Sequence, residues 1–375
     1  MVRLSVVQLL PALNGGGVER GTLEVARELV RRGHRSVVIS AGGRLVPDLI
    51  SEGSEHLGWP LGVKSPLTLR WVWPLGRWLT EQRIDILHTR SRLPAWIGWL
   101  AWRGMDPATR PRFITTVHGL YSVSRYSAIM AHGERVIAVS ETVRDYLRRH
   151  YPELPAERIQ VIQRGVDPAA FPYGYQPSAA WLADWRQHYP QLGDAPVLTL
   201  AGRLSRLKGH DDFIELIARL RARGWPVRGL IVGGVEPRRQ RYADQLRQKV
   251  RSLGLGEVIL LTGHRNDMRE IYAISTLVLS LSAQPESFGR TVLEALSLGT
   301  PVVGYDHGGV GEILARLYPA GLTPVGDLDA LTTRVSELLA VAPPVPPEPV
   351  FPLQRMLDET LALYESLGQA LRSFT

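Results

Sequence analysis

Apolar positions alternate between short continuous runs and longer helical patterns along most of the chain. In the first half the runs predict strands, at RLSVVQLL, RSVVIS, DILHT, FITTVHG, RVIAVS and RIQVIQ. Between them lie stretches with helical spacing, such as VERGTLEVARELVRRG, in which Leu23, Ala26, Leu29 and Val30 share one face. Gly33 is predicted to end that helix. This alternation predicts a parallel sheet covered by helices.

The same rhythm restarts at Val197, in the second half of the chain. The apolar runs there are VLTLAGR, GLIVGG, VILLTGH, TLVLSLS and PVVGYD, separated by helical stretches such as HDDFIELIARLRARG. Two such series predict an α/β fold with two Rossmann-like, doubly wound domains of parallel strands. Because open α/β sheets bind ligands beyond the carboxyl ends of their strands, we expect the site in a cleft that the two domains face.

Segments rich in proline and glycine mark the predicted domain boundaries. RGVDPAAFPYGYQP separates the two series, which gives a first domain over residues 1–170 and a second over residues 171–350. A stiff proline linker, APPVPPEPVFP, then leads into a final helix within residues 351–375, at LQRMLDETLALYESLGQALRS.

Length and composition narrow the class of protein. The chain has 375 residues, of which 45% are hydrophobic, and this suits two packed α/β domains. The stretch nearest to a membrane span, LPAWIGWLAW, is shorter than the roughly 18 apolar residues that a span needs. The absence of cysteine excludes a disulfide framework and thiol chemistry, and we expect a cytoplasmic protein.

The net charge of +8 comes from the first half of the chain. Residues 1–165 carry 23 Lys and Arg against 14 Asp and Glu, and they hold seven of the ten tryptophans. A basic, tryptophan-rich half suits peripheral binding to an anionic membrane surface or an acidic, lipid-linked partner. It equally suits a solvated basic face over core tryptophans, and both interpretations stay open. Nucleic acid is disfavoured, because the basic residues are spread over many elements.

The first candidate motif is NGGGVERG at residues 14–21, which follows a strand and opens a helix. Its glycines allow a ligand to approach the backbone, and the helix offers free N–H groups to an anion. The spacing matches neither the dinucleotide fingerprint nor the Walker A loop, so a simple tight turn is the alternative.

A second motif, AGRLSRLKGHDDF, follows the first strand of the second half. Arg203 and Lys208 stand five residues apart ahead of a helix, where two cations can clamp a diphosphate. Two ordinary surface cations are the alternative. Lysine is rare in this chain, however, with only three among 44 basic residues, which favours a specific use of Lys208.

His118, in TTVHGL, stands at the end of a predicted strand. A single histidine is more often structural than functional. Its place at the carboxyl end of a strand makes a functional role equally plausible.

Two glutamates frame the start of a helix in PESFGRTVLEALSLG. An ion pair with Arg290 would explain Glu294, and a capping or dipole role would explain Glu286. In the functional interpretation, Glu286 and the N–H groups of residues 288–290 face one end of a ligand. Glu294, two turns further, faces hydroxyls about 10 Å away. That span suits a nucleotide-sugar.

ESFGRTVLEALSLGTPVV resembles the paired-glutamate signature of retaining GT-B glycosyltransferases, the large family 4-like group that includes sucrose-synthase-like and lipopolysaccharide-core enzymes. The resemblance extends to GGGVERGTLEVARELVRRGH, TVHG, VIAVSETVRDYL, GRLSRLKG and GGVGEIL, in the order that the family shows. HTRSRLPAW and the basic, tryptophan-rich half look most like enzymes that extend envelope glycolipids.

The resemblance implies a role for each candidate residue. His118, Arg203, Lys208 and Glu286 would be catalytic, with His118 beside the reacting carbon, the two cations on the diphosphate and Glu286 on the sugar hydroxyls. Glu294 would bind the ribose. The implied donor site also includes Gly16, Gly17, Gly263, His264, Ser287, Phe288, Gly289 and Arg290. The final helix would cross back onto the first domain.

The implied activity is retaining transfer of a sugar from a nucleoside diphosphate sugar to a glycan or lipid-linked acceptor. Uridine is favoured over guanosine as the base, and lipopolysaccharide core or another envelope glycan is the expected product. No cofactor or metal is expected, since helix capping explains Asp327 and Asp329 better than metal binding does. A GT-B phosphorylase, an epimerase and a non-catalytic nucleotide-sugar or glycolipid-binding subunit remain alternatives.

Overall fold

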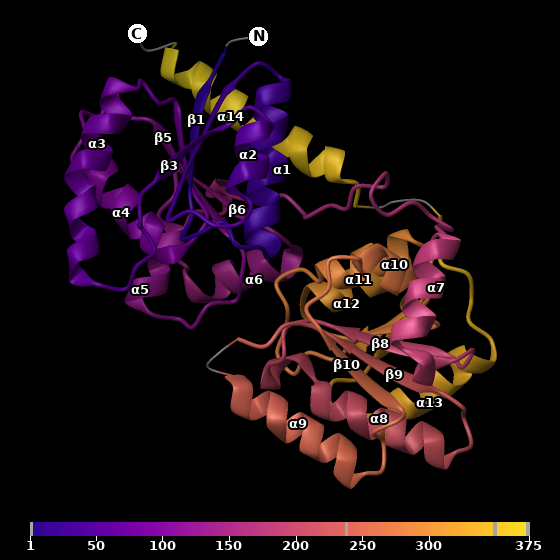
Figure 1. The fold of residues 1–375 in the computed structure, drawn as a ribbon. Helices are drawn as coiled ribbons and strands as arrows, with labels where there is room; N and C mark the ends of the chain where they lie inside the picture. The colour runs from indigo at the N-terminus through magenta and orange to yellow at the C-terminus, as the bar shows by residue number, and fades with distance from the viewer. Residues whose placement is uncertain (1–2, 237–238, 348–350, 373–375) are drawn as a thin grey trace. The chain divides into compact units, whose positions relative to one another are not determined.

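The computed structural model describes residues 3–236, 239–347 and 351–372. It divides the chain into two units (Figure 1). Unit 1 contains the chain up to Arg164 together with the residues from Gln354 onward, and unit 2 runs from Gly165 to Leu353. The sequence placed the divisions at residues 170 and 350.

Unit 1 is built on a seven-stranded parallel sheet in the order β3-β2-β1-β4-β5-β6-β7. β1 lies at the centre, where Val7 is in register with Val37 of β2 and Leu87 of β4. The strands are β1 (Ser5–Leu9), β2 (Arg35–Ser40), β3 (Glu55–Gly58), β4 (Ile86–Thr89), β5 (Arg112–Val117), β6 (Arg135–Ala138) and β7 (Ile159–Val161). The helices are α1 (Gly17–Arg31), α2 (Val46–Ser51), η1 (Pro66–Trp71), α3 (Val72–Glu81), α4 (Arg92–Arg103), α5 (Arg125–Ala128), η2 (Ile129–Ala131), α6 (Glu141–His150), η3 (Ala156–Arg158) and α14 (Leu353–Arg372).

Unit 2 repeats this plan with a six-stranded sheet in the order β10-β9-β8-β11-β12-β13. The strands are β8 (Val197–Ala201), β9 (Arg228–Val232), β10 (Ile259–Gly263), β11 (Leu277–Ser280), β12 (Val302–Tyr305) and β13 (Leu322–Thr323). The helices are α7 (Ala179–His188), η4 (Pro190–Leu192), η5 (Arg206–Lys208), α8 (His210–Ala222), α9 (Gln240–Ser252), α10 (Met268–Ala273), α11 (Arg290–Ser297), α12 (Gly308–Leu317), η7 (Pro319–Gly321) and α13 (Leu328–Ala340).

Most of the first-half tryptophans are partly buried and pack against the core. Five of them pack against one apolar cluster of unit 1 built around Phe113 and Ile97: Trp59, Trp71, Trp78, Trp99 and Trp102. Trp73 differs, because 74% of its surface is exposed. Among the described residues, no helix is both long enough and apolar enough to cross a bilayer.

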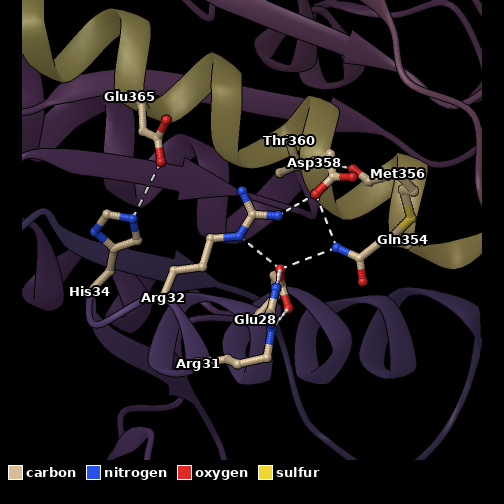
Figure 2. Close-up of polar contacts among 9 residues, drawn as sticks. All are labelled: Glu28, Arg31, Arg32, His34, Gln354, Met356, Asp358, Thr360 and Glu365. Carbon is tan, nitrogen blue, oxygen red and sulfur yellow. Dashed lines mark hydrogen bonds and ion pairs between the residues drawn. The ribbon is translucent and has the colours of Figure 1, made fainter. Parts of the chain in front are cut away.

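The final helix, α14, belongs to unit 1, as the sequence predicted for its return to the first domain (Figure 1). The last predicted residue, Ser373, and residues 348–350 of the predicted linker lie outside the described part. Figure 2 shows polar contacts of α14 with the end of α1 and with Arg32 and His34, which follow it. Buried Glu28 accepts hydrogen bonds from Arg31, Arg32 and Gln354.

Candidate functional site

The strand order of unit 2 defines where a ligand site is expected. β8 has β9 and then β10 on one side, and the chain then crosses to β11 on the other side. The order therefore reverses between β8 and β11. In open α/β sheets this switch point, at the carboxyl ends of the strands, is the usual ligand crevice.

Two opposite charges meet at this switch point. Lys208 follows β8, Glu286 follows β11, and the Lys208 Nζ atom donates to Glu286 Oε1 at 2.7 Å. Gly209 positions the lysine loop. Its φ is 71°, and a Cβ there would lie 1.9 Å from the Leu281 carbonyl oxygen. Only glycine allows this close approach of the two loops.

A glycine-rich turn holds the Glu286 loop in place. The Gly309 N–H donates to the Glu286 carbonyl oxygen at 2.8 Å, and a Cβ on Gly309 would lie 2.3 Å from Phe288 Cα. His307 bonds the carbonyl oxygen of Ser282 at 2.8 Å, and the Ser282 hydroxyl donates to Glu286. The GGVGEIL motif and the preceding His307 therefore hold the Glu286 loop in position.

Glu286 is ionised at neutral pH. Burial raises the pKa of its carboxyl group, but the Lys208 ammonium, the Ser282 hydroxyl and His307 outweigh burial and lower it below the usual value. The alternative in which the Glu286 side chain caps α11 is wrong, since Gly289 is the N-cap of α11 and no side chain caps that helix end.

Glu294 lies on α11 and is buried, with 5% of its surface exposed. Arg290 Nε donates to its Oε1 atom at 3.0 Å, so the i,i+4 ion pair exists. It is not a solvated surface pair, because the carboxylate is withdrawn from water. A buried carboxylate on a helix that starts at the switch point can accept hydroxyl hydrogen bonds from a ligand.

Arg203 and Lys208 contact different carboxylates. Arg203 is 73% exposed along its side chain and donates to Glu236 Oε1 at 2.7 Å, whereas Lys208 is bound to Glu286. Arg203 therefore has no part in the half-buried Lys208–Glu286 pair.

The remaining donor-site candidates of unit 2 lie in loops that follow strands or precede helices. Gly263 closes β10 with a φ of 74°, and His264 bonds Asn266 Oδ1 at 3.1 Å. Phe288 is buried and packs edge-on against Phe351, with ring centroids 5.9 Å apart. Ser287 lies between Glu286 and Phe288, and Gly289 has a φ of 109° before Arg290 begins α11.

In unit 1 the predicted residues follow β1 and β5. Gly16 is the N-cap of α1 and Gly17 its first residue. His118 is half-buried after β5, and Arg164 Nη2 donates to its Nδ1 atom at 2.9 Å. Burial, and then the charges of Arg164 and Arg90 and the nearby His88, lower the pKa of His118 well below its usual value.

The sequence motifs did not point to Arg90 or Arg164. Both are buried polar residues of unit 1. Arg90 follows a strand in HTRSRLPAW much as His118 does in TVHG, and that parallel was an available signal. No sequence signal pointed to Arg164, because it stood in the predicted break between the two domains.

No group of three or more histidine, aspartate or glutamate side chains with metal-binding geometry occurs among the described residues. Asp327 caps α13, since its Oδ1 atom accepts from the N–H groups of Asp329 and Ala330. Asp329 pairs with Arg219 at 2.6 Å. The capping explanation is confirmed for Asp327, whereas the Asp329 side chain forms an ion pair.

Two family models match the chain. The Glycosyltransferase Family 4 model matches residues 15–170, and the Glycosyl transferases group 1 model matches residues 183–343. Together they cover most of both units.

Among curated proteins, the chain is similar to the D-inositol 3-phosphate glycosyltransferase of Rhodococcus erythropolis. The two are 29% identical over 294 residues, which cover 69% of this chain. The match spans 63% of the length of that relative, which is less than two thirds.

Two solved structures share the fold over nearly the whole chain. A glycosyltransferase from Rickettsia africae is 28% identical, with a TM-score of 0.85 and coverage of 97% of this chain and 98% of that one. Anabaena Alr3699/HepE, solved in complex with UDP and glucose, is 20% identical, with a TM-score of 0.78 and 99% coverage of both chains.

Proposed function

This chain belongs to the family 4-like glycosyltransferases, and from that premise we propose that it transfers a sugar from a nucleoside diphosphate sugar, with retention of configuration. The observation that carries the proposal is the Lys208–Glu286 pair at the switch point of unit 2. In this proposal the cation of the pair serves a diphosphate and the carboxylate serves sugar hydroxyls.

In this proposal unit 2 binds the donor. Lys208 and Arg203 contact the diphosphate, Glu286 holds the sugar, and Glu294 accepts from the ribose. The N–H groups of Ser287, Phe288, Gly289 and Arg290 contribute donors, and Gly263 and His264 contact the base through their backbone. From unit 1, His118 contacts the sugar, and Gly16 and Gly17 contact the diphosphate and the acceptor.

The chemistry follows from where charge develops. When the bond between the anomeric carbon and the β-phosphate oxygen breaks, negative charge grows on that phosphate. Lys208, Arg203 and the N–H groups stabilise this charge in the transition state. The acceptor hydroxyl attacks the same face, forms the new glycosidic bond and gives its proton to the departing phosphate. We propose that no metal ion takes part.

We propose uridine as the base, in line with the UDP held by the Anabaena neighbour. A glycan or glycolipid of the cell envelope, such as lipopolysaccharide core, is the proposed acceptor, and the cytoplasmic face of the membrane is the proposed place of action. The surface that would meet the membrane is the 63–73 segment of unit 1. Its exposed apolar residues Val63, Leu67, Leu69 and Trp73 are interspersed with the exposed cations Lys64 and Arg70.

A thermal-shift screen with UDP, GDP and their sugars tests the donor. Ligand binding to the folded state raises the melting temperature, so UDP-sugars are expected to raise it more than GDP-sugars do. Turnover of the best donor in EDTA then tests metal independence, and loss of activity that Mg²⁺ or Mn²⁺ restores would refute it. NMR of the product's anomeric proton tests retention.

The alternatives give different outcomes in the same assay. Strict dependence on inorganic phosphate would identify a phosphorylase. A change of sugar configuration in the free nucleotide-sugar would identify an epimerase. Donor binding with neither transfer nor slow hydrolysis would identify a binding subunit.

A further inference from the structure

A group of polar side chains lies inside unit 1, and the proposed chemistry uses only one of them. We call it the arginine–histidine cluster; it contains His88, Arg90, Thr116, His118, Arg164 and Tyr364. Arg90 is 4% exposed and Arg164 9% exposed. Buried guanidinium groups are rare unless they have specific partners, so the cluster requires an explanation.

The bond between Arg164 and His118 fixes the position of one hydrogen. Arg164 Nη2 lies 2.9 Å from His118 Nδ1, and a guanidinium group only donates hydrogen bonds. Nδ1 must therefore be the acceptor. A neutral imidazole carries a single N–H hydrogen, so the hydrogen of His118 is on Nε2.

His88 is bonded at both ring nitrogens. Its Nδ1 atom lies 2.5 Å from the Tyr364 hydroxyl oxygen, and its Nε2 atom lies 2.6 Å from Thr116 Oγ1. Both partners are hydroxyls, which can donate or accept, so either tautomer of His88 satisfies both contacts. The tautomer is therefore fixed by a guanidinium partner at His118 alone of these two histidines.

The charges around these imidazoles keep them neutral. Burial lowers the pKa of both histidines well below the usual value, and the charges of Arg90 and Arg164 lower it further. Glu24 is the carboxylate that interacts with Arg90, and Tyr364 has its pKa raised to about 12, so it stays un-ionised. Around His118, Arg92 lies near the phenol of Tyr121, which is bonded to the His118 backbone.

The alternative of a ligand site within the cluster fails on size. The cavity that these side chains line has a volume of about 20 Å³, which is room for one water molecule and not for a phosphate or a sugar. The packing of α1 adds to the confinement, since a Cβ on Gly21 would lie 1.9 Å from Arg164 Nη1. The missing side chain of Gly21 therefore leaves the space that the Arg164 guanidinium occupies.

We propose that Arg164 is a positioning residue that holds His118 in its Nε2–H tautomer. The purpose of this arrangement rests on the proposed function: His118 would then offer a hydrogen-bond donor to a hydroxyl of the donor sugar. The same side chain in its other tautomer would offer an acceptor there.

The direct test needs no substrate. In ¹⁵N-histidine-labelled protein, the ¹⁵N shifts distinguish a protonated ring nitrogen from an unprotonated one, and His118→Ala assigns the His118 signals. We expect the hydrogen of His118 on Nε2 at neutral pH. We expect Arg164→Leu to give mixed tautomers and a raised His118 pKa, while Arg164→Lys, which keeps a cationic donor, largely retains Nε2–H.

Arg149→Leu is the matched control, because Arg149 is an exposed arginine of unit 1. It should leave the His118 signals unchanged. A His118 hydrogen on Nδ1 in the wild type, or signals that Arg164→Leu does not change, would overturn the proposal. The signals of the other histidines and the melting temperature show whether Arg164→Leu remains folded.

Kinetics test the purpose separately. Arg164→Leu should lower kcat roughly ten- to hundredfold, as misplaced catalytic groups do. Arg164→Lys should restore most of the turnover. Full turnover by His118→Ala would overturn the purpose. A wild type that turns over no nucleotide-sugar would overturn the proposed function instead, and the tautomer assignment would still be decided by NMR.

Discussion

Lys208 and Glu286 are 78 residues apart in the chain and 2.7 Å apart at their charged atoms. If Lys208 binds the donor diphosphate, Lys208→Met should weaken UDP binding about ten- to hundredfold, because a hydrogen bond to a charged group contributes roughly 1.5–3 kcal/mol. Calorimetric titration with UDP measures this directly. The matched control is Lys249→Met, since Lys249 pairs with Asp211 at 3.2 Å and has no proposed role. Equal UDP affinity in Lys208→Met and wild type would exclude Lys208 from the diphosphate site.

The two glutamates should separate nucleotide binding from turnover. Glu294→Ala should weaken UDP and the UDP-sugar by similar factors, about ten- to hundredfold, because both ligands carry the ribose. Glu286→Ala should leave UDP binding at least as tight as in the wild type, because it removes the carboxylate that Lys208 now contacts. It should lower kcat on the order of a hundredfold, since the reacting sugar is misplaced.

Arg290→Ala is the control for Glu294→Ala. Arg290 forms the ion pair with Glu294, so if the loss of that pair alone weakens UDP binding, Arg290→Ala should weaken it equally. Unchanged UDP binding in Glu294→Ala would mean that the Glu294 carboxylate contacts Arg290 and does not bind the ribose. Lost UDP binding in Glu286→Ala would give Glu286 a structural role in the loop.

At the residue scale, the sequence did not predict which candidate side chains contact one another. The rarity of lysine pointed to Lys208, and the two glutamates that frame the start of a helix pointed to Glu286. Their contact depends on β8 and β11 becoming neighbours, which no local pattern encodes. For the same reason the sequence did not predict that Arg203 pairs with Glu236, which lies in a different loop.

At the element scale, the predicted GT-B fold is confirmed by the solved neighbours and by the two parallel sheets. The long apolar runs became strands, and the strands without such runs were missed. β3 (Glu55–Gly58) and β13 (Leu322–Thr323) both lie at sheet edges. An edge strand has one neighbour and needs less apolar surface, so its sequence carries a weak strand pattern.

The predicted final helix is held to α1 by Glu28, and this contact is testable. Glu28→Gln should lower the free energy of unfolding by about 1–3 kcal/mol, because Arg32 and Gln354 lose a buried charged acceptor. Urea unfolding at neutral pH measures the loss. Glu359→Gln, which breaks the exposed pair of Glu359 with Arg355 on α14, is the control and should cost about 0.5 kcal/mol or less.

The pH dependence gives this prediction a second measurement. Hydrogen bonds from Arg31, opposed by burial and reinforced by Arg32 and Gln354, lower the pKa of Glu28 from 4.5 to about 2. A lowered pKa stabilises the fold above the unfolded-state pKa and loses that effect as the pH falls. The stability difference between wild type and Glu28→Gln should therefore shrink between pH 4.5 and pH 2. A constant difference would mean that packing, and not charge, explains the loss.

For the whole molecule, the charge imbalance and the tryptophans have separate explanations. Residues 1–165 keep their basic excess, but five of their tryptophans pack on the core of unit 1. Composition alone could not distinguish tryptophans that pack on the core from tryptophans that face a membrane, because burial depends on the tertiary fold. The exposed apolar surface proposed to contact a membrane is the 63–73 segment, in which Leu67 is 72% exposed and Trp73 74% exposed.

If the 63–73 segment binds membranes, the protein should bind anionic vesicles and lose binding as salt screens charges beyond about 8–10 Å. Leu67→Ser with Trp73→Ser should weaken vesicle binding at least tenfold, because burial of one such side chain contributes about 1.5–3 kcal/mol. Lys64→Glu with Arg70→Glu should weaken binding to anionic vesicles, as each basic residue contributes about 1 kcal/mol there.

Vesicle co-sedimentation measures these affinities, and unit 2 supplies the control. Val341 is 79% exposed and Leu253 44% exposed, so Val341→Ser with Leu253→Ser removes similar exposed apolar surface elsewhere. That variant should bind like the wild type. Equal binding of the wild type to neutral and anionic vesicles would exclude the electrostatic part of the mechanism. Equal loss in the control variant would mean that exposed apolar surface in general, and not the 63–73 segment, brings the protein to the vesicle.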